Sequence, residues 1–315
     1  MNVATFIAMG TVNTITLFEP DTQNILPRVF EYVKSMEQKL TVHHSDSEIM
    51  RLNANAGIAP VAVSEEVFAL LLRAHAASLE EGSGFNFALG ALTRLWRAYQ
   101  KQGIVPFDTQ IAAARALCDP HLVWLDAGSC RAFLTQPGMS LDLGAIAKGY
   151  IADGVKRLLA EAGIERATID LGGNVVLHGQ SPKQADGLWR VGIQQPYAAK
   201  GEYAAVCRLP AVSVVTSGVY ERYAEAGGRQ YHHLINPQTG YPFDNGMLGA
   251  TVIAPDSTEA EIRSTQIFAQ GAAGAADSRS DVWRVLIDKE KRMFVSRALL
   301  PFFELKDAAY QVIPV

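Results

Sequence analysis

The chain has 315 residues, enough to bury a large core as one big domain or two closely merged ones. Hydrophobic residues make up 49% and charged residues 19%, and the net charge of -4 argues against a general nucleic-acid binder, because no overall cationic field would hold a polyphosphate backbone. No apolar stretch approaches the ~20 residues of a membrane helix. Three widely spaced cysteines exclude a cysteine zinc site and fit a reducing compartment. The N-terminus lacks a basic leader segment, so we expect a cytoplasmic protein without a secretory leader.

Periodicity predicts the elements in chain order. Residues 5–18 read as a strand pair, or as one long strand interrupted at Met9-Gly10-Thr11. Helical spacing of apolar residues predicts a helix over 26–40, and Ser64 is placed to cap a second helix through Glu81. A third helix is expected over 145–162, directly after a strand-like run that ends at Gly144. The remaining expected elements are strands near 121–125, 131–134, 166–169, 174–177, 189–193, 204–209, 212–215, 250–253, 285–287 and 292–295, and a helix over 258–270.

Strands and helices mix in this order without a strict alternation. The pattern therefore predicts an α+β fold around mixed or antiparallel sheets with packed helices. We expect a single domain over residues 1–315, with a loop or internal boundary near 271–281.

The segment SLDLGAIAKG, residues 140–149, is the first candidate for chemistry. A glycine turn followed by a helix points free backbone N–H groups at an anion, and the helix dipole favours negative charge there. Lys148 lies in the first turn, where the dipole disfavours a cation, and a facing phosphate would explain it. The alternative is an ordinary turn with a solvated lysine. Neither a dinucleotide fingerprint nor a P-loop motif is present.

Three further segments have both a functional and a plain interpretation. The run from Asp170 to Asn174 carries a Gly-Gly pair that allows close backbone approach to a ligand, or simply forms a hairpin turn. The adjacent histidines in YHHLINPQTGYP point to opposite faces of a strand, so only one of them can serve a given site. Taken alone, the pair fits the plain alternative better, in which a strand histidine is a packed, hydrogen-bonded residue. Glu261 and Thr265 share one helix face and could offer two oxygens to Mg²⁺, whereas Thr258 with Glu261 also fits a capping box.

These segments together closely resemble the FAD:protein FMN transferases, the ApbE family. The resemblance runs from Met9 to Gly271 and is carried by MGT, LTVHHSDSEIMRLN, FNFALGALTRLW, DLGAIAKGY, LGGN, TSGVYERY, HHLINPQTGYP and the closing helix. It implies an ApbE-like, T-fold-related α+β fold. It also implies Mg²⁺-dependent transfer of FMN from FAD to a threonine hydroxyl of a target protein, with release of AMP.

The resemblance also assigns roles to residues. FAD-contacting positions are matched by Met9, Phe85, Asn86, Asp142, Lys148, His233 and Ile235. The metal site is matched by the carbonyl of Ala145 with Glu261 and Thr265. His233 is the expected base, because histidine has an intrinsic pKa near ~6.5, and Asp142 is the alternative base or an orienting group.

Several positions depart from the family pattern. The usual metal carboxylate is Asp, and Glu261 is one methylene longer, so we expect weaker Mg²⁺ binding or an altered preference that could admit Mn²⁺. Asn86, Val219 and Asn236 stand where Asp is expected, and His43 where a flavin-stacking aromatic is common. FAD pyrophosphatase activity, yielding FMN and AMP, and a non-catalytic FAD-binding protein therefore remain as alternatives.

Overall fold

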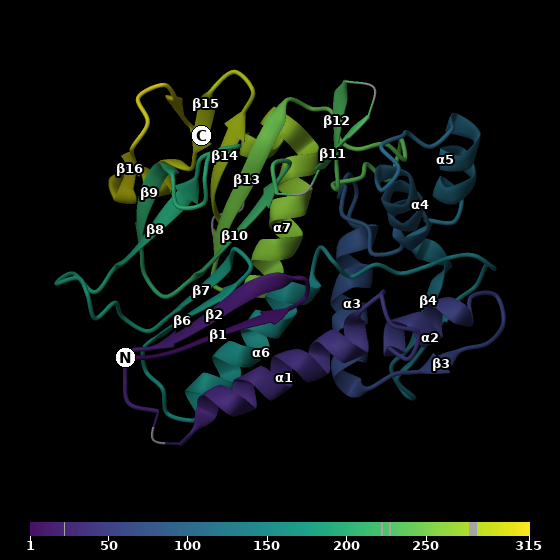
Figure 1. The fold of residues 1–315 in the computed structure, drawn as a ribbon, viewed down its shortest axis with the longest axis horizontal. Helices are drawn as coiled ribbons and strands as arrows, with labels where there is room; N and C mark the ends of the chain where they lie inside the picture. The colour runs from purple at the N-terminus through teal and green to yellow at the C-terminus, as the bar shows by residue number, and fades with distance from the viewer. Residues whose placement is uncertain (22, 222, 227, 277–281) are drawn as a thin grey trace. The chain divides into compact units, whose positions relative to one another are not determined.

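The computed structural model describes the whole chain except residues 22, 222, 227 and 277–281 (Figure 1). Its contacts divide the chain into two compact units. The first unit comprises residues 1–36, 148–218 and 245–315, and the second comprises 37–147 and 219–244. Whether the chain is one domain over 1–315 stays a prediction. Of the expected boundary near 271–281, residues 277–281 lie outside the described part, and Gly271–Ala276 form the short 3-10 helix η2.

The first unit is built on a nine-stranded sheet in the order β1-β2-β6-β7-β10-β13-β14-β15-β17. All neighbours are antiparallel except β15 and β17, so the sheet is mixed, and the expected α+β class is confirmed. The strands are β1 Asn2–Ala8, β2 Thr11–Leu17, β6 Ala167–Leu171, β7 Asn174–His178, β10 Ser213–Gly218, β13 Met247–Ala254, β14 Trp283–Asp288, β15 Arg292–Val295 and β17 Gln311–Pro314.

Both faces of this sheet are covered. Helix α7, Ser257–Gln270, packs against β10 and β13 (Figure 1). On the other face lies a three-stranded sheet of β8 Trp189–Gln194, β9 Tyr203–Leu209 and β16 Phe303–Leu305. Strand alternation explains this layering, because Val214 and Ile253 enter the core shared with β8 and β9 while their buried neighbours Val215 and Val252 point the opposite way.

Two helices complete the first unit. Helix α1, Ile25–Leu40, places Phe30 edge-on against Phe6 of β1. Helix α6, Ala147–Glu161, packs so closely on α1 that a side chain at Gly154 would overlap Tyr32. Of the two alternatives for residues 5–18, the strand pair is confirmed and the single long strand is wrong, because β1 and β2 pair in register on either side of the turn.

The second unit is largely helical. Its helices are α2 Glu48–Ala54, α3 Glu65–Leu79, α4 Gly90–Gln100 and α5 Asp108–Arg115, with the short 3-10 helix η1 Pro120–Leu122; a further one, η3 Arg297–Phe302, belongs to the first unit. Its strands form a three-stranded sheet, β3 Val61–Ala62, β5 Arg131–Leu134 and β4 Val123–Asp126, and a hairpin, β11 Tyr223–Ala226 with β12 Arg229–His232. Ser64 does occupy the N-cap of α3, but its side chain makes no cap hydrogen bond, and the helix ends at Leu79 rather than Glu81. Within the described part of the chain, no helix combines the length and apolar character needed to cross a membrane.

The cysteines differ in reactivity according to their burial. Burial raises the pKa of the Cys118 thiol to about 11 and that of Cys207 to about 12, so neither forms a thiolate near pH 8. Cys130 is partly exposed. We therefore expect one fast-reacting thiol per chain with an aromatic disulfide reagent at pH 8, and three after unfolding. The Cys130→Ser variant should lose the fast phase; a fast phase that persists in it would contradict this assignment.

Candidate functional site

The predicted site residues fall into two sets, one in each unit, and each set is held together by its own contacts. In the second unit, the run 140–144 is not a strand of any described sheet. It is an extended segment, and the helix expected directly after Gly144 begins at Ala147. Local pattern could not reveal this, because the segment pairs with residues that are distant in sequence.

Backbone hydrogen bonds place this segment beside the Phe85–Asn86 region. Asp142 N–H donates to the carbonyl of Phe87 at 2.9 Å, and Gly90 N–H donates to the carbonyl of Ser140 at 2.8 Å. A Cβ on Gly90 would lie 2.5 Å from the Ser140 carbonyl oxygen, so only glycine permits this approach. Asn53 clamps the segment from the other side through both the N–H and the carbonyl of Leu141. Asp142 is thus brought next to Phe87, the residue after Asn86.

The carboxylate of Asp142 is already engaged on both oxygens. Oδ1 accepts the N–H of Gly144 at 2.9 Å, and Oδ2 accepts the hydroxyl of Thr93 at 2.8 Å, with Arg97 3.6 Å away. This engagement favours Asp142 as an orienting group, which fixes the glycine turn, over Asp142 as a base. Thr93 and Arg97 were not singled out from the sequence, although both belong to the FNFALGALTRLW segment and its continuation.

The histidine segment of the second unit is anchored by aromatic residues. Trp96 stacks on Tyr231 and donates its indole N–H to the carbonyl of Gly240 at 2.8 Å. His232 ends β12, and its ring is used within the loop: Nδ1 accepts the N–H of Leu234, and Nε2 donates to the carbonyl of Phe243 at 2.8 Å. Both ring nitrogens of His232 thus serve the loop, and His233 as the base stays a prediction. Ile235 is buried and bridges to Pro242 across the same loop.

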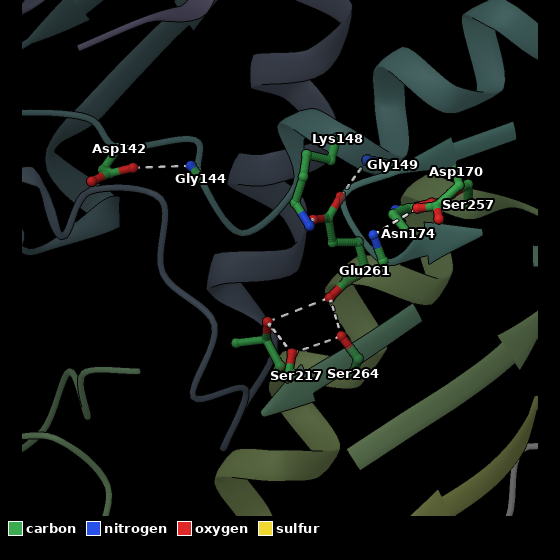
Figure 2. Close-up of polar contacts among 12 residues, drawn as sticks. Asp142, Gly144, Lys148, Gly149, Asp170, Asn174, Ser217, Ser257, Glu261 and Ser264 are labelled. Carbon is green, nitrogen blue, oxygen red and sulfur yellow. Dashed lines mark hydrogen bonds and ion pairs between the residues drawn. The ribbon is translucent and has the colours of Figure 1, made fainter. Parts of the chain in front are cut away.

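In the first unit, half-buried Lys148 and buried Glu261 form an ion pair, to which the N–H of Gly149 adds a hydrogen bond (Figure 2). The Glu261 side chain comes from α7 and reaches α6, where Oε2 accepts the N–H of Gly149 and Oε1 lies 3.6 Å from Lys148 Nζ. The alternative of a capping box is wrong: the N-cap of α7 is Asp256, whose side chain accepts the N–H of Glu259. Glu261 is free of any capping role because Asp256 already performs it.

Burial raises the pKa of Glu261 above its usual range, opposed by the Lys148 ammonium and the Gly149 N–H. The side chain of Glu261 is only 6% exposed, so its negative charge is poorly solvated. Lys148, which sequence reasoning paired with a phosphate, has Glu261 as its protein partner. A buried carboxylate with incomplete compensation is a favourable place for additional positive charge.

Hydroxyl groups continue this cluster along α7. Ser264 Oγ and Thr265 Oγ1 both donate to the carbonyl of Glu261, at 2.9 and 3.4 Å, and Ser217 of β10 lies 2.8 Å from Ser264 and 3.4 Å from Thr265 (Figure 2). Because the hydroxyls of Ser264 and Thr265 both donate to the Glu261 carbonyl, their oxygen lone pairs can accept a hydrogen bond or bind a cation. Ser217 lies in the TSGVYERY segment, to which the sequence assigned no individual role.

The oxygen donors present fit a hard cation bound by few protein ligands. Among the described residues, His, Cys, Asp and Glu side chains do not gather in threes at any place that could hold a metal ion. A carboxylate and hydroxyls on one helix face instead suit Mg²⁺, which usually keeps several waters and takes one or two carboxylates together with substrate phosphates. The donor chemistry around Glu261 therefore accommodates Mg²⁺.

Two glycine turns meet at the end of the sheet that carries Met9. Met9 has a φ of 54° in the β1–β2 turn, which Asn13 braces through its amide to the carbonyls of Ala8 and Thr11. The β6–β7 turn is the plain hairpin considered above, and Gly172 there is so close to Thr11 that a Cβ would overlap it. The MGT and LGGN segments thus support one another.

A model of the ApbE family matches residues 9–284. The chain belongs to the ApbE family. An FAD:protein FMN transferase of Klebsiella pneumoniae (strain 342) is 39% identical over 310 residues, covering 98% of this chain and 95% of its own length. Another, from Treponema pallidum (strain Nichols), is 38% identical over 257 residues, covering 78% and 71%.

Solved structures of ApbE proteins agree with this assignment. The crystal structure of the ApbE protein from Thermotoga maritima superimposes with a TM-score of 0.84 at 26% identity, covering 96% of this chain and 98% of that one. The flavin transferase ApbE from Vibrio cholerae shares the fold, with a TM-score of 0.81 at 23% identity and coverage of 96% and 99%. The family resemblance and the ApbE-like fold inferred from sequence are confirmed.

Two of the positions that depart from the ApbE pattern have structural tasks here. Asn86 accepts the N–H of Ala88 and donates its amide to the carbonyl of Cys118 at 2.7 Å, a donor that Asp lacks. Asn236 accepts the N–H of Gln238 and closes the loop through Tyr241 and Gly240. Val219 is buried and His43 is exposed. Asn86 is thus explained by local hydrogen bonding and is not by itself a sign of a degenerate site.

Proposed function

We propose that this ApbE protein is an FAD:protein FMN transferase that moves FMN from FAD to a threonine hydroxyl of a target protein and releases AMP. The observation that carries the proposal is 39% identity over 98% of the chain to an enzyme of that name. The pair of half-buried Lys148 and buried Glu261 supports it, together with the neighbouring hydroxyls, since they supply charge and oxygen donors suited to a pyrophosphate substrate with a divalent metal.

The reaction balances without an external reductant or oxidant. The threonine Oγ attacks the phosphorus of the FMN half, a new P–O bond forms, and the pyrophosphate P–O bond to AMP breaks, so that AMP leaves with the bridging oxygen. His233 takes the hydroxyl proton, and Asp142 holds the glycine turn through Gly144. Lys148 places a fixed positive charge at the start of α6, where it stabilises negative charge on phosphoryl oxygens.

Glu261 and Thr265 would hold Mg²⁺, together with the Ala145 carbonyl that the family resemblance assigns. When bound, the metal supplies electrostatic stabilisation of the phosphoryl oxygens. The protein's own contribution is to fix the donors: Gly149 orients the Glu261 carboxylate, and Ser217 orients the two helix hydroxyls.

One assay tests the proposal against its alternatives. The protein is incubated with FAD and Mg²⁺, with and without a target protein that carries an acceptor threonine. AMP together with a covalently fluorescent target supports the transferase. AMP with free FMN and no labelled target would instead identify an FAD pyrophosphatase, and bound intact FAD without AMP would identify a non-catalytic binder.

The longer carboxylate arm leads to a metal prediction. We expect the wild type to need about tenfold more Mg²⁺ for half-maximal rate than Glu261→Asp, equal to ~1.4 kcal/mol, because Mg²⁺ demands near-ideal octahedral geometry. With Mn²⁺, the wild type and Glu261→Asp should differ less in the metal concentration that gives half-maximal rate. Titration of each metal into protein with FAD measures these concentrations, and Glu161→Asp, at an exposed position on α6, is the control. Equal Mg²⁺ requirements for the wild type and Glu261→Asp would contradict the prediction.

A further inference from the structure

Asp153, on α6, binds the beginning of α7. Its Oδ1 accepts the N–H of Ser257 at 2.9 Å, and its Oδ2 accepts the N–H and the hydroxyl of Thr258 at 2.8 and 2.6 Å. The first N–H groups of a helix lack partners within the helix, so a carboxylate from elsewhere can fix where the helix begins. Asp153 thus does for α7, from a neighbouring helix, what an N-cap residue does locally.

The same face of α6 carries Gly149, four residues earlier. Gly149 lies against the Ser257 carbonyl and the Glu261 carboxylate: a Cβ there would be 2.5 Å from Ser257 O and 2.8 Å from Glu261 Oε2. Lys156, one turn after Asp153, donates to the carbonyl of Pro255 at 3.3 Å. One face of α6 therefore follows the chain from Pro255 to Glu261, and Asp153 makes three of these contacts.

This docking determines the position of Glu261 relative to α6. Glu261 lies one turn into α7 from Ser257, so a shift of the helix start moves the carboxylate by the same amount. Asn174 braces Ser257 from β7 by accepting its hydroxyl at 2.8 Å (Figure 2). The Ser257 side chain is thereby fixed to the sheet, and its backbone N–H to α6.

We propose that Asp153 is a positioning residue for the Lys148–Glu261 pair. By fixing the start of α7, it holds the Glu261 carboxylate on the Gly149 N–H and beside Lys148 Nζ, and so sets the affinity for the divalent metal. The role of Glu261 as a metal ligand rests on the proposed function; the effect of Asp153 on the Gly149–Glu261 contact does not.

The test compares Asp153→Ala with Asp256→Ala. Both remove a carboxylate that caps α7, but Asp256 accepts the N–H of Glu259 on its own helix, whereas Asp153 reaches the N–H groups of Ser257 and Thr258 from α6. The loss of a helix cap should lower Tm by about 2–4 °C in either variant, so stability alone does not separate them. Asp153→Asn, which keeps one acceptor oxygen, serves if Asp153→Ala does not fold.

Two readouts distinguish positioning from a purely structural role. Hydrogen exchange of the Gly149 amide, measured without metal or FAD, should quicken about tenfold in Asp153→Ala and stay near wild type in Asp256→Ala. Binding of Mn²⁺, followed by the paramagnetic resonance of the free ion, should weaken about 10-fold or more in Asp153→Ala only. Asp153→Asn should fall between wild type and Asp153→Ala on both measures.

Equal effects of the two alanine variants on Gly149 exchange and on Mn²⁺ binding would overturn the proposal. Turnover of FAD is measured in parallel on the wild type. If the wild type releases no AMP while Gly149 exchange behaves as expected, the proposed function fails and the positioning role stands. If the wild type turns over and Gly149 exchange is unchanged in Asp153→Ala, the positioning role fails alone.

Discussion

Replacing Gly149 with alanine is expected to lower the rate of FMN transfer by about 10²-fold or more. The added Cβ would lie 2.5 Å from the Ser257 carbonyl oxygen and 2.8 Å from Glu261 Oε2, closer than real Cβ contacts allow, and both neighbours are firmly held. Helix α7 must then move away from α6, and a displacement of about 1 Å at a catalytic group can cost roughly 10²-fold in rate. Overpacking should also cost about 1–3 kcal/mol of unfolding free energy.

Packing and helix propensity predict opposite changes in the stability of Gly149→Ala, so its thermal unfolding tests the packing argument. Gly149 lies within α6, where alanine is intrinsically better than glycine by about 1 kcal/mol, so helix propensity alone predicts stabilisation. Gly154→Ala provides the control on the same helix, because its Cβ would meet the side chain of Tyr32 instead of Glu261. AMP release and thermal unfolding are measured for both variants. A Gly149→Ala protein with wild-type turnover would show that the α6–α7 contact is irrelevant to the reaction.

Strands and helices could be predicted from the sequence wherever their backbone hydrogen bonds are made within one helix or between neighbouring strands of a hairpin. The first hairpin is one case, because β1 and β2 alternate and the turn residues Met9 and Gly10 both have positive φ. Helix α7 is another, because a helix forms its backbone hydrogen bonds within itself, and the expected range 258–270 lies inside Ser257–Gln270. Helices α2, α4 and α5 were not predicted: α2 and α5 have only 7 and 8 residues, and α4 begins at a glycine whose neighbour is Ser140.

The details of the candidate site depended on contacts over long sequence distances. Leu141 and Leu143 are buried around a half-exposed Asp142, as in a strand, yet the segment pairs with Phe87, Gly90 and Asn53 individually. Whether Glu261 belongs to a capping box likewise depended on other residues. Asp256 and the distant Asp153 take the first N–H groups of α7, which leaves Glu261 to reach α6.

Gly149 and Asp153 illustrate what sequence reasoning passed over. A glycine inside a helix lowers helix propensity and usually has a packing reason, so Gly149 carried a usable signal. Asp153 carried none, because an acid on a helix surface is ordinary and its two partner residues, Ser257 and Thr258, lie more than a hundred residues away. The candidate binding residues are recognisable from motifs, whereas the proposed positioning residue Asp153 emerges only from the packing.

The adjacent histidines supply the second large expected effect. His233→Asn should lower the rate of FMN transfer by about 10²–10⁴-fold, the usual contribution of general acid–base catalysis, with a smaller loss of Tm than His232→Asn shows. His232→Asn should instead lower Tm and leave the rate of FMN transfer close to wild type, because the His232 ring closes the loop through Leu234 and Phe243. Loss of these two hydrogen bonds should cost about 1–3 kcal/mol of unfolding free energy.

Measuring turnover, FAD affinity and Tm for both variants separates the two roles. The loop from the two histidines to Pro242 is also anchored by other residues, because Trp96 donates to the Gly240 carbonyl and Gln100 donates to the Tyr231 carbonyl. Neither substitution should therefore release the loop completely. The neutral tautomer of His232 with its proton on Nε2 is fixed by these contacts, since Nδ1 accepts from a backbone N–H. A ring held in this way on both nitrogens cannot take a proton from an attacking hydroxyl without giving up a bond. If His232→Asn lost turnover with an unchanged Tm while His233→Asn remained active, the base would have to be assigned to His232.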